Sequence, residues 1–373
     1  MRSRRLVFLI LMVIAFALLA CSCGQKQQPA LKEGGQGKEP AKPAQTYTLK
    51  MNVIYPPPVF DWEAKKISTE VFAKRVEEAT QGRVKIQFFY NSQLAPAAQG
   101  LDALKKGVVD LWNGSSSWGG IVPESDVIWL PYGFMGAQHA MHVLRETEVG
   151  KIMDEAYQKQ GAKILFYWPS GSMVIISKKP VKNFNDIKGM KVRLGYAIWK
   201  NWYQRMGAAP INVAVAEQYE ALMRGTADAT IYPEYTIETY KFHEVCKYVT
   251  VPAVVDPGMC YVLVSLNTWN SLPEDLRQTI EKVALEIEKE TVPATQRLTE
   301  YALESATKKG VQIIKLNRTE FEKYKESAMP AWEEFAARSP QCAQMVKILK
   351  EDIKKWEETR PEAKQWYEKW LAK

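Results

Sequence analysis

The sequence predicts two α/β domains followed by long C-terminal helices. Three observations support this fold class. The folded part starts with a strand–helix–strand pattern, a short helix–glycine–strand unit occurs twice, and the last part of the chain has mainly helical patterns. A strand–helix–strand unit implies a mainly parallel sheet with helices on its faces. The roughly 325 residues after position 45 are enough for two domains of ordinary size.

The first unit begins with alternating apolar and polar residues over 49–53, as in a half-buried strand. Apolar positions at helical spacing then predict a helix over 62–80, and Gly82 follows its end. Alternation returns over 84–90 and predicts the second strand. The three elements together form a βαβ unit.

A similar ten-residue pattern occurs twice, as LDALKKGVVD at 101–110 and YEALMRGTAD at 219–228. Each copy predicts a helix that a glycine ends and a strand that follows at once. Two short matches can also arise by chance. A real duplication would give each domain one copy, with strands ending near 112–113 and 231–232. Ligands bind beyond such strand ends, and clefts between domains are preferred sites.

The C-terminal part predicts long helices. A helical pattern runs from 272 to about 290, a second runs to 309, and a tail starts near 320. The tail carries aromatic residues at helical spacing: Trp332, Trp356, Trp366, Tyr367 and Trp370. Such a stripe predicts helices packed onto the body rather than a ligand site.

The N-terminal segment has the features of a signal peptide. Three arginines within positions 2–5 precede an apolar run over 6–20, which is short for a membrane span. The run ends in LLAC at 18–21, which resembles the lipobox of bacterial lipoproteins and implies lipidation of Cys21. An ordinary signal peptide with an incidental cysteine is the alternative. The Gly, Gln, Lys, Pro and Ala residues that follow predict a flexible tether.

Composition argues against several other classes. The formal net charge is +8, and subtracting the three arginines of the signal peptide leaves +5. Acids and bases are interleaved, without a basic tract for nucleic acid. His139, His142 and Glu146 lack a convincing zinc pattern, and the sequence has no P-loop, dinucleotide fingerprint or GxSxG. Cys246 and Cys260 could pair outside the cytoplasm, but the sequence does not decide it.

Several stretches resemble the DctP-type solute-binding proteins of tripartite ATP-independent periplasmic (TRAP) transporters. They are GRVKIQFFYNSQL at 82–94, VPESDVIWLPYGF at 122–134, KPVKNFNDIKGMKVR at 179–193, GAAP at 207–210 and EQYEALMRGTAD at 217–228. Each piece is weak alone, but their order over most of the chain is specific to this family.

The resemblance implies a two-domain periplasmic-binding-protein (Venus flytrap) fold with a ligand cleft between the domains. It also implies an extracytoplasmic protein that is no enzyme, needs no cofactor and passes a small organic acid to two integral-membrane TRAP subunits. The expected segments are a signal peptide at 1–20, a lipidated flexible tether at 21–45, domain I at 46–170 plus about 255–300, domain II at 171–254 plus about 301–340, and a helical tail at 341–373. The alternatives are the binding protein of an ATP-driven importer, a ligand-presenting receptor subunit and an anchored enzyme.

Arg193 is the principal candidate for ligand binding. Apolar residues alternate over 190–194, so Lys191 and Arg193 share the opposite face of the strand. From the residues alone this face could be solvent. The resemblance implies instead that Arg193 clamps the ligand carboxylate, for which a planar guanidinium is well suited.

The sequence departs from the family pattern at two places. It reads Gly171-Ser-Met173 where many members have a second arginine, and Thr230-Ile-Tyr232-Pro where many have Gln-Glu-Asn-Pro. One arginine and aromatic walls favour a monocarboxylate with an apolar or aromatic body. Candidate ligand contacts besides Arg193 are Trp112, Asn113, Trp118, Trp168, Met173, Trp199, Tyr232 and Glu234. Each could instead be core, and Trp199 is the strongest aromatic candidate because it lies off the expected buried stripe of its helix.

Overall fold

The structure is a computed structural model that describes residues 45–115, 118–360 and 367–372. The predicted signal peptide, Cys21 and the tether up to position 44 lie outside the described residues. Within the described ranges, no helix combines the length and the apolar character that crossing a membrane requires.

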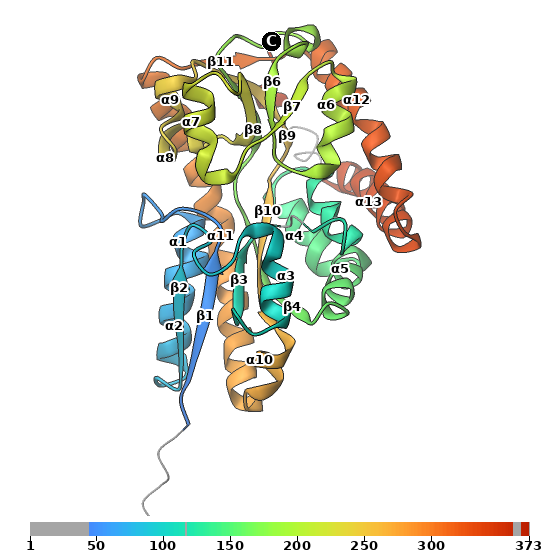
Figure 1. The fold of residues 1–373 in the computed structure, drawn as a ribbon. Coiled ribbons are helices and arrows are strands. Elements are labelled where there is room, and N and C mark those ends of the chain that lie inside the picture. The colour runs from blue at the N-terminus through green and yellow to red at the C-terminus, as the bar shows by residue number, and fades with distance from the viewer. Residues whose placement is uncertain (1–44, 116–117, 361–366, 373) are drawn as a thin grey trace, which may run out of the picture. The chain divides into compact units, whose positions relative to one another are not determined.

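The strands form two sheets, which lie one above the other in Figure 1. The first has the order β2-β1-β3-β10-β4, and its strands are β1 (Tyr47–Val53), β2 (Val84–Phe89), β3 (Leu111–Gly114), β4 (Ala162–Pro169) and β10 (Met259–Ser265). The second has the order β11-β9-β5-β8-β6-β7, and its strands are β5 (Met173–Ser177), β6 (Lys191–Leu194), β7 (Ala209–Asn212), β8 (Ala229–Pro233), β9 (Tyr248–Val255) and β11 (Gln312–Lys315). The predicted pair of α/β sheets is thus confirmed.

Both sheets are mixed rather than mainly parallel, which corrects the expected strand directions. In the first sheet β1 is parallel to β2 and β3, but β10 is antiparallel to β3 and β4. In the second sheet β5 is antiparallel to β8 and β9. The antiparallel strands β10 and β5 are those that the chain enters directly from the other sheet. The expectation of mainly parallel sheets rested on local βαβ units, and strands that enter from the other sheet are not part of such units.

Helices pack on these sheets. The predicted first helix is α1 (Ala64–Lys66) and α2 (Phe72–Ala79), joined by a π-helical turn at Ile67–Val71. The first sheet is also accompanied by α3 (Gly100–Lys105), α4 (Ala137–Glu146), α5 (Glu148–Gln158) and α10 (Leu266–Ser271), and the second by α6 (Lys200–Arg205), α7 (Gln218–Met223), α8 (Thr236–Thr239) and α9 (Phe242–Val245).

The duplicated unit is confirmed, with one copy in each sheet. Gly107 and Gly225 both adopt positive φ, at 70° and 73°, directly after α3 and α7. Asp110 then accepts the Lys50 N–H of β1 at 2.8 Å, and Asp228 accepts the Lys191 N–H of β6 at 2.9 Å. The repeated aspartate therefore ties its own strand to the parallel neighbour in the same way in both copies.

Within the residues that the structure describes, the strands of the two sheets are joined by three crossings of the chain. Residues 170–172 join β4 to β5, residues 256–258 join β9 to β10, and a long helix makes the third crossing. The two short crossings are bonded to each other, because the Ser170 N–H donates to Gly258 O and the Gly258 N–H donates to Gly171 O, both at 2.8 Å. The predicted domain boundaries at 170 and 254–255 fall beside these crossings and stay a prediction.

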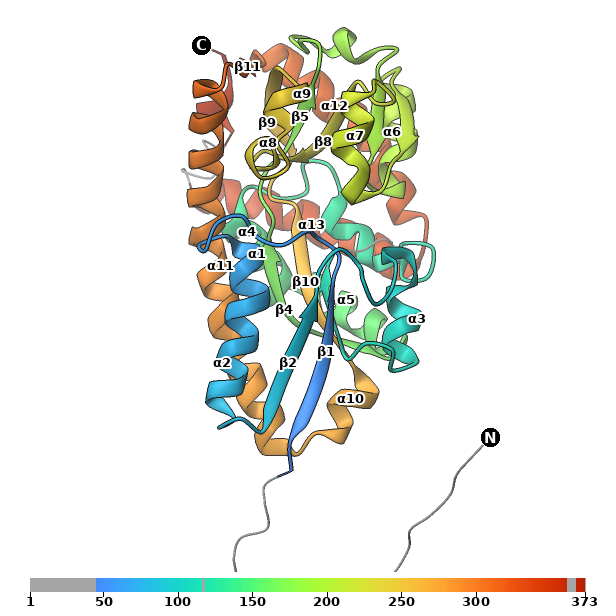
Figure 2. The ribbon, with the colours of Figure 1, turned by 60° about the vertical axis from the view of Figure 1, so that its left-hand side comes forward.

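The long helix α11 spans Glu274–Lys308 without a break, whereas two successive helices were expected. Pro293 lies inside it, where proline removes one backbone hydrogen bond. The Thr295 hydroxyl donates to Thr291 O and to Pro169 O next to this point, which ties the helix to the end of β4. Figures 1 and 2 both show α11 beside α2, and the two helices are in contact. Packing along its length thus outweighs one lost hydrogen bond.

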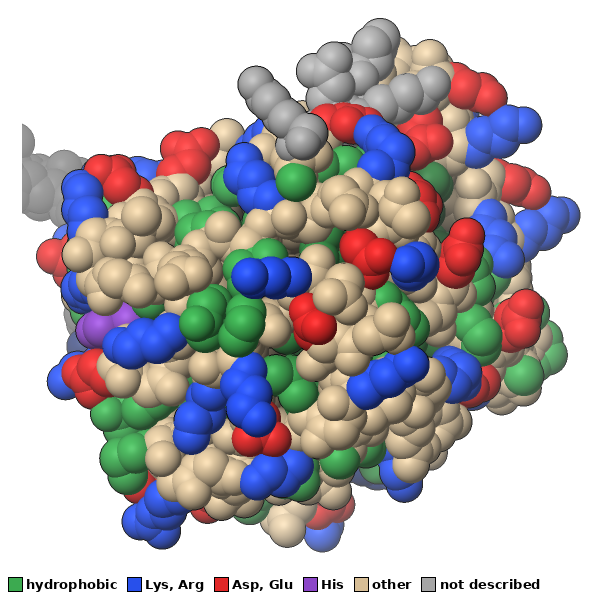
Figure 3. Space-filling view, turned by 90° about the horizontal axis from the view of Figure 1, so that it is seen from above, with side chains coloured by type: hydrophobic (Ala, Val, Ile, Leu, Met, Phe, Trp, Pro, Cys, Tyr) green, Lys and Arg blue, Asp and Glu red, His purple; other side chains and the backbone are tan. Residues whose placement is uncertain are grey.

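The C-terminal helices α12 (Arg318–Ala336) and α13 (Pro340–Thr359) pack on the body as expected. The Trp332 indole is buried and donates to Pro131 O at 2.9 Å, and Trp356 is also buried. Trp366 lies outside the described residues. On the face shown in Figure 3, basic and acidic side chains are interspersed.

The Cys246–Cys260 disulfide does not form in this structure, since both thiols are free and buried. Cys246 belongs to the apolar cluster around β9 and α9, whereas Cys260 lies on β10 in the larger core of the first sheet. The two cysteines therefore sit in different cores.

Candidate functional site

The ends of strands from both sheets approach one another in the middle of the described body. Tyr55 and Ser115 follow β1 and β3 of the first sheet, and Tyr196 and Tyr232 lie after β6 and within β8 of the second. The Ser115 and Tyr196 hydroxyl oxygens are 3.5 Å apart, so groups from the two sheets meet there. This arrangement matches the predicted position of a ligand site at strand ends.

Arg193 lies in β6 at this meeting point, and only 6% of its surface is exposed. Its Nε donates to Val213 O at 3.1 Å, and its Cζ lies 5.4 Å from the centre of the Tyr232 ring. Among the described residues, no carboxylate pairs with its guanidinium. The solvent-facing alternative is therefore wrong for Arg193. A buried cation without an anionic partner is costly, so an anion beside it would be strongly favoured.

Lys191, which shares this face of β6, has a different role. Its ammonium donates to Gly225 O at the end of α7, and its backbone N–H donates to Asp228. Lys191 therefore supports the repeated unit rather than the ligand site.

Tyr232, a second candidate from the sequence, lies next to Arg193. It is 4% exposed, and its ring centre is 5.8 Å from that of Tyr240. Burial raises the pKa of the Tyr232 hydroxyl, while the nearby Arg193 charge opposes the rise. The hydroxyl is consequently neutral and able to donate a hydrogen bond to an anion.

Two more phenols belong to this site, and the sequence reasoning missed them. The Tyr55 hydroxyl is 3.1 Å from Cys260 Sγ, and the Tyr196 ring stacks on Trp129 with ring centres 3.6 Å apart. Burial raises the pKa of both hydroxyls well above its usual value, so both are neutral. Their position after a β-strand was the only available signal, and many tyrosines share it.

Trp199 does not lie off the buried stripe, which corrects the reason for favouring it. It is fully buried, its indole N–H donates to Trp129 O at 2.7 Å, and its ring packs among the rings of Tyr196, Trp202 and Tyr203. The segment begins as a 3-10 turn at Ala197–Trp199, so the helical spacing used for the expectation does not hold there. Direct contact of Trp199 with a ligand stays a prediction.

The candidates from the first sheet are mainly engaged with their own domain. Trp112 and Trp118 pack with ring centres 5.5 Å apart, and the Trp118 indole donates to Ala97 O. The Asn113 amide donates to Thr69 Oγ1 at 2.9 Å and to Ser68, and its oxygen accepts the Trp168 indole N–H at 2.9 Å. These contacts favour the packing alternative for Trp112, Asn113 and Trp118. Trp168 also contacts Tyr55 edge to face at 5.8 Å, which places it closer to the site.

Met173 and Glu234 lie near the crossings between the sheets. Met173 is 1% exposed and packs close to Gly258. The Glu234 carboxylate accepts the Thr299 hydroxyl of α11, and burial raises the pKa of this carboxyl to about 8. Glu234 thus points toward α11, and its role as a ligand contact stays a prediction.

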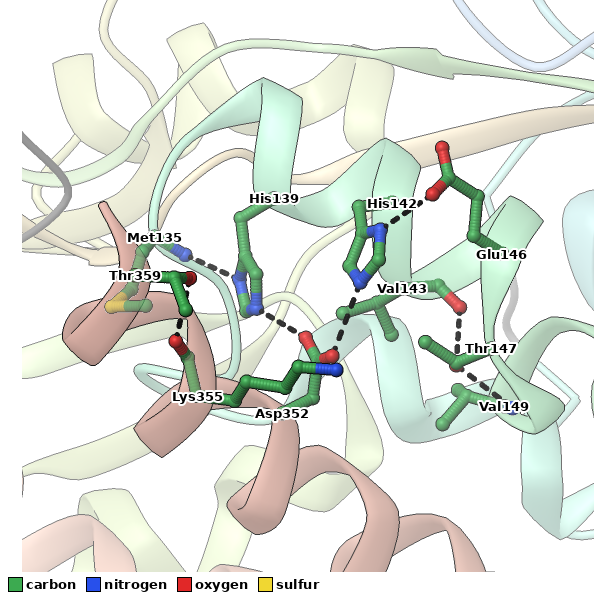
Figure 4. Close-up of polar contacts among 10 residues, drawn as sticks. All are labelled: Met135, His139, His142, Val143, Glu146, Thr147, Val149, Asp352, Lys355 and Thr359. Atoms are coloured by element: carbon green, nitrogen blue, oxygen red, sulfur yellow. Dashed lines mark hydrogen bonds and ion pairs between the residues drawn. The ribbon is translucent and has the colours of Figure 1, made fainter.

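His139 and His142 form a hydrogen-bonded chain between α4 and α13 (Figure 4). The Met135 N–H donates to His139 Nδ1 at 3.0 Å, and His139 Nε2 lies 3.0 Å from Asp352 Oδ2. His142 lies between Asp352 Oδ1 at 3.1 Å and Glu146 Oε2 at 2.9 Å. No group of three metal-binding side chains with suitable geometry occurs among the described residues. This cluster therefore joins two helices.

Comparison with known proteins decides the family. Residues 62–339 match the family model described as bacterial extracellular solute-binding protein, family 7, also called DctP. The chain belongs to this DctP family. The C4-dicarboxylate-binding periplasmic protein DctP of Rhodobacter capsulatus is 29% identical over 270 residues, which cover 70% of this chain and 77% of that protein. The sialic acid-binding periplasmic protein SiaP of Vibrio cholerae is 27% identical over 272 residues, which cover 72% and 83%.

Solved structures of the DctP family share the fold. A TRAP periplasmic solute-binding protein from Desulfovibrio salexigens with bound orotic acid is similar with a TM-score of 0.76 and 25% identity, covering 82% of this chain and 98% of that one. A TRAP protein from Sulfitobacter sp. NAS-14.1 with bound β-D-galacturonate has a TM-score of 0.74 at 20% identity, covering 81% and 99%. The predicted two-domain α/β fold and the predicted TRAP family are both confirmed.

Proposed function

We propose that this protein captures a small organic acid between its two domains and delivers it to TRAP-type membrane subunits. One observation carries the proposal: Arg193 is a buried arginine at the meeting point of the two sheets, with no carboxylate partner among the described residues. The names of the relatives support it, since DctP, SiaP and the orotic acid-binding protein all bind carboxylic acids.

The chemistry of the site supports a monocarboxylate with an apolar or aromatic body as the ligand. Arg193 supplies a single charged clamp, and the surrounding groups are neutral phenols and indoles, mainly Tyr55, Trp168, Tyr196 and Tyr232. A second carboxylate would be buried without a cation, which is unfavourable. Orotic acid, a planar ring with one carboxylate, is a compound of this class.

Thermal unfolding with a panel of acids tests this function. The panel contains aliphatic and aromatic monocarboxylates, dicarboxylates, sugars and amino acids. A ligand at 100 times its Kd adds about 2.7 kcal/mol of stability. We expect the largest shift from an aromatic monocarboxylate. A response to sugars alone would contradict the proposal.

The Arg193→Ala variant tests the clamp. Removing one partner of a buried charge pair costs about 2–5 kcal/mol, which weakens binding roughly 30-fold to 4,000-fold. Arg205→Ala is a matched control, because Arg205 pairs with Glu334 on the surface at α12. Its affinity should remain that of the wild type. Equal affinities of the Arg193→Ala variant and the wild type would contradict the clamp.

We also propose that Cys21 carries a lipid that holds the protein on the outer side of a membrane. The LLAC run at 18–21 and the polar tether after it support this anchor. Cell fractionation of a Cys21→Ser variant tests it. The variant should leave the membrane fraction, whereas retention equal to that of the wild type would contradict the anchor.

A further inference from the structure

A second group of polar side chains lies where the three crossings between the sheets meet. Ser172 belongs to the crossing after β4, Asp256 to the crossing after β9, and Thr299 to α11. Glu234 joins them from the residue after β8. These four side chains line one cavity of about 10 Å³, which is close to the smallest volume that holds one water molecule.

Hydrogen bonds arrange the oxygens of this group. The Ser172 hydroxyl donates to Asp256 Oδ1 at 2.7 Å, and the Thr299 hydroxyl donates to Glu234 Oε1. The Glu234 N–H donates to Ser172 O at 3.1 Å, so the residue is fixed from its backbone as well. Ser172 and Thr299 thus hold the two carboxyl groups at the cavity, and the four residues come from four segments that are far apart in sequence.

One oxygen of this group is left without a partner. Glu234 is 1% exposed, and its Oε2 has no hydrogen-bond partner within the described part of the chain. A buried carboxylate oxygen without a partner is unfavourable, and native proteins leave few of them. The remaining walls are the apolar side chains of Val174, Val251, Ala253 and Leu303, which offer it no donor, and Trp370, whose indole N–H does not bond to it.

The ligand atoms available here are all oxygens, from the carboxyl groups of Glu234 and Asp256 and from two hydroxyls. Because burial raises the pKa of Glu234 to about 8, a cation that binds at neutral pH displaces a proton from this group. Oxygen ligands suit hard cations rather than zinc or copper. Calcium takes six to eight oxygens and magnesium keeps several waters, and this cavity offers neither enough ligands nor enough room for them. A dehydrated monovalent cation needs fewer oxygen ligands and less room, so it fits this cavity.

We propose that Ser172, Glu234, Asp256 and Thr299 form a site for a monovalent cation of the size of sodium, at the crossings between the two domains. An ion there joins both short crossings and α11, so it stabilises their arrangement. A larger cavity of about 270 Å³ shares Ser172, Asp256 and Thr299 and leads toward Arg360 and Lys369.

Thermal unfolding of the full chain in detergent, without any organic acid, tests the site. Sodium chloride is compared with choline chloride at equal ionic strength. Sodium well above its Kd should raise the midpoint of the wild type by about 2–5 °C. Failure of the organic-acid function leaves this result unaffected, because no acid is present.

Variants of the lining residues show whether the sodium shift comes from this cavity. Glu234→Gln and Asp256→Asn keep the shape of the side chains but remove the charge, and each should abolish the sodium shift. Glu238→Gln is the matched control, because Glu238 pairs with Lys309 and Ser305 and does not line the cavity. It should retain the full shift. Equal midpoints of the wild type in sodium and choline, or a sodium shift that persists in Glu234→Gln, would overturn the proposal.

Discussion

At the scale of single residues, Asn113 uses its whole amide within the first domain. It donates to Ser68 and Thr69 of the first helical segment and accepts from the Trp168 indole. It is fully buried at the end of β3. The side chain therefore couples the end of a strand to a helix and to the wall of the site.

Asn113→Ala should lower the free energy of unfolding by about 2–4 kcal/mol, because it leaves the buried Trp168 N–H without its acceptor and the oxygens of Ser68 and Thr69 without their donor. Denaturant unfolding measures this change. Asn267→Ala is the control: Asn267 is exposed and donates to Lys105 O at 3.3 Å. Its effect should stay within about 0.5 kcal/mol. Similar effects of the two substitutions would contradict a structural role for Asn113.

His139 makes stability depend on pH. It is fully buried, and burial lowers the pKa of its imidazole to about 4, although Asp352 opposes the change. Below pH 6.5 the unfolded chain binds a proton that the folded chain does not, so stability falls as the pH drops from 6.5 to 4. The loss is about 2–3 kcal/mol.

A His139→Gln variant should show a weaker decline over the same pH range, because the titrating group is gone. Its stability at pH 7 will also be lower, so the slopes rather than the absolute values are compared. Thermal unfolding at half-unit pH steps gives both slopes. Equal slopes of stability against pH for the wild type and His139→Gln would contradict a contribution of His139 to the pH dependence.

At the scale of elements, α11 is held to the first sheet by an ion pair between the buried Glu288 carboxylate and the partly exposed Arg145 side chain. Glu288 accepts from Arg145 Nε at 2.9 Å and from the Tyr167 N–H at 2.7 Å, and Arg145 Nη2 donates to Leu165 O. Glu288 is 5% exposed. The pair therefore joins α11, α4 and β4.

Glu288→Ala should cost about 2–3 kcal/mol of unfolding free energy, because it leaves the buried Tyr167 N–H without its acceptor and the partly exposed Arg145 side chain without its anion. Glu290→Ala, on the same helix, removes the surface pair with Arg75 and should cost less than about 1 kcal/mol. Chemical denaturation of the two variants measures the difference. Equal losses of unfolding free energy in the two variants would contradict a special role of Glu288 in holding α11 to the first sheet.

The elements were predictable where the signal is local. The repeated helix–glycine–strand unit needs a left-handed residue and a strand directly after it, and Gly107 and Gly225 provide this. The continuity of α11 through Pro293 was not predictable, because it depends on packing against distant segments such as Pro169. The direction of β5 and β10 likewise depends on where the chain crosses between sheets.

The site was predictable only in part for the same reason. Arg193 could be singled out as a candidate because alternation and a family motif coincide on β6. The aromatic candidates were less certain, since a tryptophan after a strand fits a core as well as a cleft, and Trp199 proved to be fully buried. Tyr55 and Tyr196 come from segments about 140 residues apart, and only the folded chain brings them to one site.

At the scale of the whole molecule, binding should change the relation between the two domains. The Ser115–Tyr196 contact and the buried Arg193 side chain describe a closed site. Without an anion the Arg193 charge favours exposure to water, so the free protein should open. Small-angle scattering of the full chain should show a smaller radius of gyration with a saturating acid. An unchanged radius would contradict closure.

A crystal structure with the best acid of the panel tests whether Arg193 binds the ligand. We expect the ligand carboxylate to lie about 3–4 Å from the Arg193 guanidinium, with the Tyr232 ring beside it. A carboxylate bound elsewhere, with Arg193 facing solvent or a protein carboxylate, would contradict the account.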